Sequence, residues 1–451
     1  MRRRQINFRH SLRSGSQHNR EQGIVIAMVA VFLLLVIGAM MALSIDVVTL
    51  YTARSEAQLA ADAAALAGAR TLANSGMTSD PNAVTDGLAS SAEMLASNVA
   101  LQVGQSNLVG GRNLVAANGE VVVVGFGGTA TNPCVAPTNP CITVRVQRTD
   151  LPTFFARIWG RKQLAVAASA TAEAYNPSGA SASGGTTIPV APMCVKPWLL
   201  PNISPNNSTL PIFNPGTGAI GDPSLLGWPY GPTPPLRMTT DCAPCTNTSA
   251  PSVWKYYPGT TDPSGDFPAP SASSCIGCGG FNSYQLSVAG CVQTPISCNK
   301  TVHIDQANDV SDPSTALAVN VLAHSNSNGG DVIDYAAAPP PFQFVAGADN
   351  PLVLSNPSLS GTDIMVSDSL VTVPVINVDN ANWPPSGYGN FPNVQIIGFV
   401  QLFVSTTGRR SVSGRLRTQV INLAGCGTNA SGQPIIGNGA SPVPVRLISP
   451  P

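Results

Sequence analysis

The sequence predicts an α+β protein: a long N-terminal helix, then an α+β domain, then a β-rich region stapled by disulfides. Three observations support this prediction. A charge-free apolar run continues into an alanine-rich segment, strand-like segments follow, and Pro, Gly and Cys are frequent in the second half. Helices and strands that are segregated along a chain are typical of α+β folds.

The apolar run at residues 24–45 predicts a transmembrane helix. It carries no charged residue and is longer than the about 20 residues that a helix needs to cross a bilayer. Arginines crowd the preceding segment 1–23, so the positive-inside rule puts this segment in the cytoplasm and everything after Asp46 outside. A cleaved signal peptide is the alternative, but its apolar core is usually about 7–15 residues long. We therefore expect an uncleaved signal anchor.

An alanine-rich helix is expected to continue directly from the membrane. Nearly every residue from 53 to 73 is a good helix former. An unbroken helix from Ile24 to about Asn74 would be about 75 Å long. Its small side chains share a face, which allows another backbone to approach closely. This alanine face consists of Ala57, Ala61, Ala64 and Ala65. It has two open interpretations: packing against its own domain, or packing against other subunits.

Residues 46–175 are predicted to form the first extracytoplasmic domain. After the long helix, Asp80 and Pro81 are typical of a helix start, and this second helix should extend to about Leu101. Strands are expected at residues 120–126, 142–148 and 163–175, with a short helix at 154–159. The Gly/Ser-rich segment 176–187 is predicted to be a flexible linker that ends the domain.

Residues 188–451 are predicted to form the β-rich second region. Strands are expected at 188–195, 363–378, 394–405, 415–423 and 444–448, and a short helix at 314–322. Between residues 201 and 298 the chain is rich in Pro, Gly and Cys. Such a long irregular stretch needs stapling to stay ordered.

The ten cysteines all lie after Asp46, on the side expected to be outside. An even number in an oxidising compartment favours disulfides. We expect Cys134 to pair with Cys141 across a proline-rich hexapeptide. The same spacing makes Cys291 and Cys298 a second candidate pair, and Cys194 with Cys426 a third that would join the ends of the second region.

Two C-x2-C pairs leave other chemistry open. They consist of Cys242, Cys245, Cys275 and Cys278. In a reducing compartment such knuckles would favour tetrahedral zinc. Here the spacer between the pairs is longer than the about 15–20 residues that are usual, and thiols outside the cell tend to oxidise. Disulfides are therefore preferred, with zinc and a thioredoxin-like redox pair as alternatives.

The segment from Asp46 to Ala69 resembles the N-terminal module of TadG-like proteins of bacterial Tad (Flp) pilus assembly systems. The resemblance covers residues 1–75 and rests on a long string that ends in AADAAALAGA at residues 60–69. Its motif positions here are Gly23, Asp46, Tyr51, Asp62 and Gly68. Weaker similarity follows at 153–160 and 164–172, in the segment that closes the family's first extracytoplasmic domain, and at 394–400.

This resemblance implies a pilin-like α+β domain and a function. The chain would be a single-pass protein of the bacterial inner membrane that helps to build a pilus or its secretion apparatus. Its partners would be the membrane, other assembly or channel proteins, and a second copy through the alanine-rich helix. Prepilin peptidase substrates carry Glu at the fifth position after the cleavage glycine, and here Met28 follows Gly23 at that position. The chain therefore resembles an accessory protein rather than a filament subunit.

Several other functions find no support in the sequence. A net charge of zero with 10% charged residues argues against nucleic-acid binding. A G-x-G-x-x-G string at 216–221 lies between prolines, so it lacks the strand and helix of a dinucleotide site. Asp309 to Pro313 has proline where a D-x-S-x-S metal site needs its second serine. We expect no enzyme activity and no cofactor, and the alternative function is a surface-exposed adhesin or ligand-binding protein.

Overall fold

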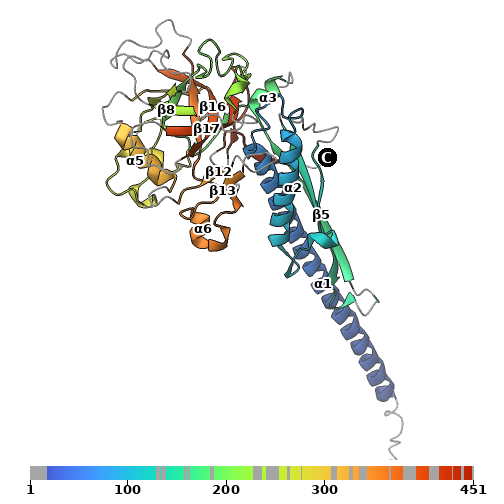
Figure 1. Cartoon of the computed structure of the whole chain (residues 1–451). Coiled ribbons are helices and arrows are strands. Elements are labelled where there is room, and N and C mark those ends of the chain that lie inside the picture. Colours follow the sequence, from blue (N-terminus) through green and yellow to red (C-terminus); the bar gives the residue numbers. More distant parts are fainter. Residues whose placement is uncertain are drawn as a thin grey trace, which may run out of the picture.

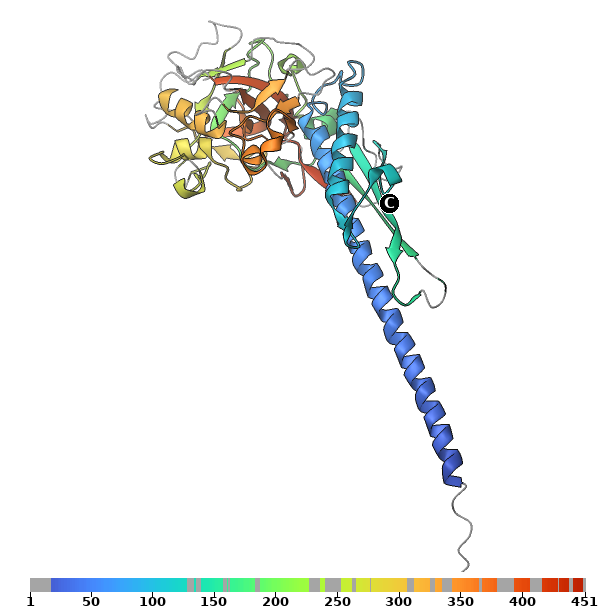
Figure 2. The same cartoon turned by 60° about the horizontal axis from the view of Figure 1, so that its bottom comes forward.

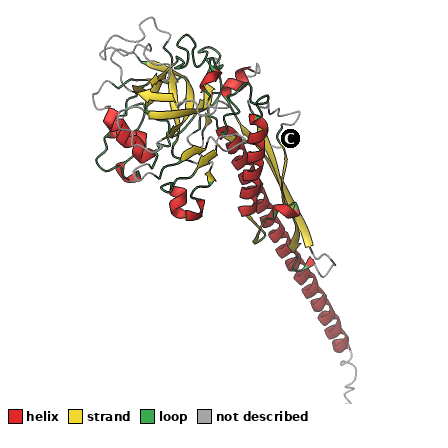
Figure 3. Cartoon of the chain, in the orientation of Figure 1, coloured by secondary structure: helices red, strands yellow, loops and turns green. Residues whose placement is uncertain are grey.

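The computed structural model describes residues 18–127, 134, 139–156, 160, 163–182, 187–226, 236–239, 253–261, 265–275, 277–305, 312–324, 329–334, 343–364, 367–378, 393–405, 416–428, 430–437 and 441–448. Most of the basic segment 1–23 therefore lies outside the described residues, as do Cys242 and Cys245 and part of the helix expected at 154–159. Figure 3 shows the chain as an elongated helix with a mixed α/β body at one end.

A single continuous helix, α1 (His18–Asn74), forms the axis of the protein. This confirms the prediction of an unbroken helix from the apolar run into the alanine-rich segment. Figure 2 shows its N-terminal half projecting from the folded body. Among the described residues, α1 is the one helix long and apolar enough to cross a membrane. The large apolar side chains there are exposed, for example Ile24 at 66% and Ile45 at 49%, as expected for a surface that lipid would cover.

The C-terminal half of α1 belongs to a compact unit that we call the stem domain. Helix α2 (Leu88–Ser106) and α1 pack on a four-stranded sheet of order β19-β5-β4-β3. Its strands are β3 (Val121–Gly125), β4 (Cys141–Pro152), β5 (Gln163–Ala174) and β19 (Val445–Ile448), all antiparallel. The small elements β1 (Leu108–Val109), β2 (Arg112–Asn113) and η1 (Ala116–Asn118) connect α2 to β3. The strands expected at 120–126, 142–148 and 163–175 are confirmed.

Two details of the stem domain differ from prediction. Strand β19 was expected in the second region but pairs with β5, as Val445 with Ala174, so the chain returns to the stem at its end (Figure 1). The second helix begins at Leu88 rather than at Pro81. The Asp80 carboxylate accepts a hydrogen bond from the backbone N–H of Asn82 within a turn, and Gly87, at φ 77°, precedes the helix. A left-handed residue cannot continue a helix, which explains the later start.

The remaining elements form a second unit that we call the head. Its main sheet has the order β10-β7-β15-β16-β17-β8-β9, with β11 paired to β16. These strands are β7 (Trp198–Pro201), β8 (Leu236–Thr239), β9 (Val253–Lys255), β10 (Tyr257–Pro258), β11 (Thr301–Val302), β15 (Leu370–Ile376), β16 (Val394–Ser405) and β17 (Leu416–Gly425). The long central strands β15 to β17 are rich in apolar residues and almost wholly buried, so they form the core of the head.

Shorter elements surround this sheet. Helices α4 (Ser283–Ala289) and α5 (Asp312–Leu322) pack together, and the Trp198 indole N–H donates to the Tyr284 hydroxyl at 3.0 Å beneath them. The other elements are β6 (Val190–Ala191), η3 (Pro223–Leu225), η4 (Ala272–Ser274), β12 (Val332–Asp334), β13 (Gln343–Val345), α6 (Pro351–Ser355), η6 (Pro357–Leu359), β14 (Asp363–Ile364) and β18 (Ile435–Ile436). The helix expected at 314–322 and the strands expected at 394–405 and 415–423 are confirmed.

The first part of the predicted flexible linker at 176–187 is folded. Its first residues form a short helix, α3 (Pro177–Ala182), and Asn176 and Ser178 are buried. The Gly/Ser composition suggested an exposed tether, but both polar side chains bond to the head, as described below. Residues 183–186 lie outside the described part.

Candidate functional site

Asp46, which directly follows the apolar run of α1, joins this helix to the tip of the β4–β5 hairpin. Its Oδ1 accepts from the backbone N–H of Phe154 at 2.8 Å, and its Oδ2 accepts from Phe155 at 3.0 Å and Ala156 at 2.6 Å. The sequence analysis singled out Asp46 and segment 153–160 separately. The structure brings the two together.

The charge of Asp46 is well stabilised in this position. The carboxylate is 5% exposed, and removal from water raises the pKa of Asp46. The three backbone N–H donors outweigh that effect and leave the pKa below its ordinary value. Asp46 is therefore a charged acceptor at neutral pH that fixes a turn of backbone.

The other motif residues divide into packed and exposed positions. Asp62 is half-buried, and its Oδ1 accepts from Gln58 Nε2 at 2.8 Å. Gln58 Nε2 also donates to the Ser169 carbonyl on β5 at 3.4 Å. Tyr51, in contrast, is 71% exposed, and Gly23 has open space around it. The structure thus brings Asp46 and Asp62 to the contact between α1 and the sheet and leaves Tyr51 and Gly23 on the surface.

Gly68 marks the closest approach of α1 to its neighbours. A Cβ at this position would lie 2.6 Å from Ile142 Cδ1 on β4 and 3.3 Å from the Ala96 carbonyl oxygen on α2. Three elements therefore meet at one backbone that has no room for a side chain. This explains why glycine stands in the middle of an otherwise alanine-rich helix, where it costs helix stability.

The alanine face of α1 is covered by the chain itself. Each of its four alanines has 0% exposure within the core of the stem domain. Of the two interpretations, packing against the chain's own domain is confirmed. Self-association through the alanine-rich helix stays a prediction, and it would have to use another face of α1, because α2, β4 and β5 already cover these four alanines. The apolar side chains of α1 that stay exposed beyond Asp46 include Val48 and Leu59.

A buried polar network fixes the last turn of α1 to the head. The Asn422 side-chain amide on β17 donates to the Ala73 carbonyl at 2.6 Å and to Gln401 Oε1 on β16 at 2.5 Å. The Ser79 hydroxyl accepts from the Leu423 N–H at 2.9 Å and donates to the Leu423 carbonyl at 3.0 Å. A side chain of β17 thus supplies a donor to the end of α1, and a side chain just after α1 bonds the free backbone groups of Leu423 on β17.

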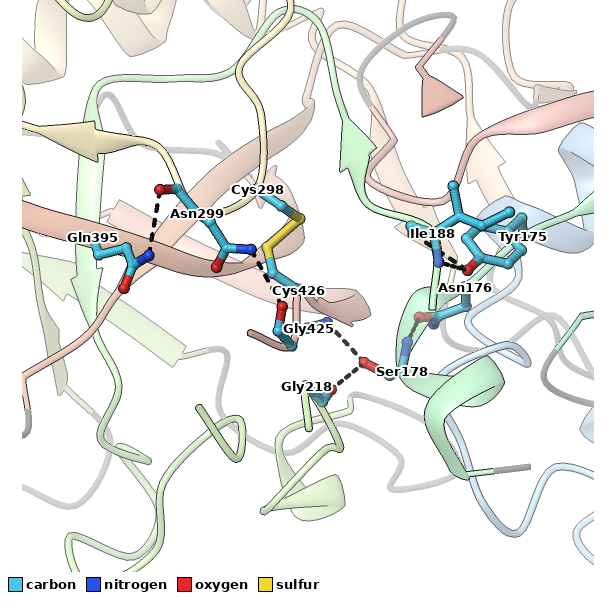
Figure 4. The surroundings of a disulfide bond; sticks show 11 residues. Tyr175, Asn176, Ser178, Ile188, Gly218, Cys298, Asn299, Gln395, Gly425 and Cys426 are labelled. Atoms are coloured by element: carbon cyan, nitrogen blue, oxygen red, sulfur yellow. Dashed lines mark hydrogen bonds between the residues drawn. A yellow bond between two sulfur atoms is a disulfide. The ribbon is translucent and has the colours of Figure 1, made fainter. Parts of the chain in front are cut away.

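The first residues after β5 complete this joint. Asn176 Nδ2 donates to the Leu423 carbonyl at 3.0 Å, and the Ser178 hydroxyl accepts from Gly425 N–H at 2.7 Å while donating to the Gly218 carbonyl at 2.8 Å. Figure 4 shows Ser178 reaching Gly425, one residue before Cys426. Sequence reasoning missed this joint. The available signal was an isolated polar residue, Gln401 or Asn422, inside each apolar strand.

The disulfides follow the cysteine prediction in part. Cys134 pairs with Cys141 as expected. Cys194 pairs with Cys291 and Cys298 with Cys426, so the expected pairs Cys291–Cys298 and Cys194–Cys426 are wrong and their partners are exchanged. The reason is topological: Cys298 lies just before β11, which pairs with β16 beside the end of β17, so Cys426 is its neighbour. Both bridges tie the irregular segment to the head.

Cys275 and Cys278 form a disulfide within one knuckle. A disulfide sulfur is not a thiolate, so in this state the pair offers no ligand to the zinc site considered above. In the described part of the chain, no group of three His, Cys, Asp or Glu side chains is arranged to hold a metal ion.

A polar hollow of about 210 Å³ lies on the stem domain beside β2 and β4. Its charged groups are already paired: the Arg112 guanidinium contacts Glu120 at 2.5 Å and Asp150 at 2.9 Å. The hydrogen bond from Arg112 holds the pKa of Glu120 below its ordinary value. Arg148 donates to the Val109 and Gly110 carbonyls, and Glu56 on α1 accepts from Gly110 N–H at 2.6 Å. The cluster fastens the β1–β2 turn to α1, which is a structural role.

Both histidines beyond the apolar run contact aspartates. His303 Nδ1 lies 2.9 Å from Asp266 Oδ2, and His324 Nε2 lies 2.8 Å from Asp368 Oδ2. The hydrogen bond to Asp368 raises the pKa of His324. Neither pair has a hydrogen bond to a serine or cysteine among the described contacts, so the geometry indicates hydrogen bonds that fasten loops.

Comparison with known proteins supports a specific class for the N-terminal module. Residues 24–71 match the Tad family model of TadE/G-like proteins of Flp pilus assembly. The match covers the apolar run together with Asp46, Asp62 and Gly68, the motif positions of α1 that contact the rest of the stem domain. No curated protein and no solved structure gives a significant match to the chain.

Proposed function

We propose that this chain is a membrane-anchored, non-enzymatic component of Tad/Flp-type pilus assembly or of its secretion apparatus. The observation that carries the proposal is the family match at 24–71, in a helix whose Asp46 is hydrogen-bonded to the folded domain. In this proposal the bacterial inner membrane holds residues 24–45, the basic segment is cytoplasmic, and the stem and head are extracytoplasmic.

The architecture suits a rigid support. From Asp46 to Asn74, α1 would extend about 42 Å from the membrane at about 1.5 Å per residue. The buried joint between α1 and β17 leaves the head no free tether, so the head would be presented at a fixed height and orientation. The long helix backed by an antiparallel sheet also supports the proposal that the stem domain is pilin-like. Other pilus-assembly or secretion-channel proteins would be the partners of the exposed head and stem surfaces.

The test is filament assembly in cells that lack this chain. Pili are counted by electron microscopy after restoring the intact chain, Asp46→Asn or the matched control Asp62→Asn, with protein levels checked by immunoblotting. We expect the intact chain and Asp62→Asn to restore filaments and Asp46→Asn to restore few. Normal filaments in the strain without the chain would contradict the proposal. Normal filaments with lost attachment to surfaces would favour the adhesin alternative.

A further inference from the structure

The tip of the β4–β5 hairpin lies where α1 would leave the membrane. Strand β4 runs along α1 towards its N-terminal half and ends at Pro152, and β5 starts back antiparallel from Gln163 (Figure 2). We call the described residues that follow β4, Thr153 to Ala156, the tip of this hairpin. Asp46, the first charged residue after the apolar run, holds this tip through Phe154, Phe155 and Ala156. The position of the tip along the helix is therefore fixed at the end of residues 24–45.

The folded chain also covers part of the apolar run itself. Ala42 lies one turn before Asp46 on the same face of α1 and is 7% exposed, and Ala39 is half-buried. Elsewhere in the run the large apolar side chains are exposed, as at Leu34 with 75%. The covered part of α1 therefore extends from Asp46 to Ala42, which is about 6 Å towards the membrane centre at about 1.5 Å per residue. The segment that Asp46 holds on this face is the hairpin tip.

The described tip presents an apolar aromatic side chain to its surroundings. Phe154 is 62% exposed although its backbone is held rigidly, and Phe155 beside it is half-buried. In the sequence, Trp159 and three basic residues follow before β5; their structure lies outside the described residues. Aromatic side chains are enriched at the level of lipid headgroups, where an apolar ring meets a polar boundary. A fixed, exposed phenylalanine at this height matches that environment.

We propose that the β4–β5 tip inserts Phe154 into the headgroup region of the same bilayer that α1 crosses. The inference rests on the proposed anchoring of α1 and goes beyond it, because it adds a second point of contact with lipid. One helix alone can rotate and tilt in a bilayer. Two points, α1 and the tip, fix both movements, and the rigid joint transmits this orientation to the head.

Photo-crosslinking to lipid tests the proposal on the full chain. A p-benzoylphenylalanine is placed at position 154, and the purified protein is reconstituted in vesicles of phosphatidylethanolamine and phosphatidylglycerol. Position 124 is the matched control, since Val124 on β3 is also 62% exposed. Its neighbour Val123 pairs with Val144 of β4, so position 124 lies about 30 Å from the tip at about 3.3 Å per residue. Position 34 within the apolar run is the positive control.

We expect lipid adducts, measured by mass spectrometry, at positions 154 and 34 and none above background at 124. The Asp46→Asn variant should lower the adduct yield at position 154 severalfold and leave that at 34 unchanged. Adducts at 34 without adducts at 154 would overturn the inference and leave the anchoring intact. The absence of adducts at 34 as well would overturn both.

Discussion

The Asn422 side-chain amide donates a hydrogen bond to the Ala73 carbonyl over 2.6 Å, and so joins the central sheet of the head to the last turn of α1. The last carbonyls of a helix have no partner within it, and burying them unpaired is costly. Here a strand side chain supplies the missing donor, while the Thr78 and Ser79 hydroxyls donate to Oδ1 of the same Asn422 side chain at 3.3 Å. The end of the helix and the start of the head are thus one folded unit.

The first prediction concerns this joint. Asn422→Ala should lower the free energy of unfolding by about 3 kcal/mol, because it leaves several buried groups without partners. Chemical denaturation of the full chain in detergent measures the loss. Asn118→Ala, at an exposed asparagine, is the control and should change stability little. Equal effects of the two substitutions would show that the network contributes nothing specific.

The second prediction concerns the exchanged disulfide partners. Peptide mapping without reduction should find Cys298 linked to Cys426 and Cys194 linked to Cys291. Loop closure makes the bridges unequal: replacing Cys298 and Cys426 by Ala should cost about 5 kcal/mol, and replacing Cys134 and Cys141 about 2 kcal/mol. The separations are 128 and 7 residues. Linkage of Cys291 to Cys298 in the peptide map would contradict the structure.

The third prediction concerns Gly68. Gly68→Val should destabilise the stem domain by about 1–3 kcal/mol, because the new side chain would collide with Ile142 and with the Ala96 carbonyl. Ala67→Val, on the preceding residue of α1, is the control, because it introduces the same β-branched side chain at a half-buried position where alanine already has room. Helix propensity alone favours Gly68→Val over Ala67→Val, since glycine is the poorer helix former, so a larger loss at position 68 reports the collision. Thermal unfolding in detergent measures both. A Gly68→Val protein as stable as Ala67→Val would mean that α2 and β4 can move away without cost.

The sequence was sufficient for the elements whose patterns are local. The charge-free run and the alanine-rich segment predict one helix, and α1 is one helix. The small-residue alternation at 163–175 predicts a strand, and β5 occupies it. The family resemblance also identified motif positions, Asp46 among them. Nothing in the local sequence indicated that the partners of Asp46 are Phe154 to Ala156, about a hundred residues further on.

The contacts that were missed depend on pairing between distant segments. Periodicity does not state which sheet a strand joins, so β19 was assigned to the second region although it pairs with β5. Equal spacing made Cys291 and Cys298 a natural pair, but the strand order brings Cys426 to Cys298 instead. Composition made residues 176–187 a linker, and only the packed structure shows that Asn176 and Ser178 are joint residues.

The last prediction concerns Lys196, a buried cation in the head. Its side chain is removed from water, which lowers the pKa of Lys196 to about 8, against the opposing effect of Asp368. Its Nζ donates to the Gly290 carbonyl at 2.5 Å. The unfolded chain keeps this proton up to the ordinary pKa near 10.5, so between pH 8 and 10.5 the unfolded state binds one more proton. Stability is therefore highest above pH 10.5, where Lys196 is neutral in both states. It decreases as the pH falls from 10.5 to 8, because the unfolded chain then takes up a proton that the folded chain does not.

Lys196→Met isolates this contribution. At pH 7 the buried charge of Lys196 lowers the free energy of unfolding of the wild type by about 3 kcal/mol, and the variant avoids this cost. The variant also loses the hydrogen bond to the Gly290 carbonyl, which is worth about 1 kcal/mol. We expect the variant to be more stable than the wild type by about 2 kcal/mol at pH 7, and the difference to shrink as the pH rises from 8 to 10. Urea denaturation across this range measures it, and other lysines and tyrosines cancel because both proteins contain them. Parallel stability curves for the two proteins would show that Lys196 keeps its ordinary affinity for a proton.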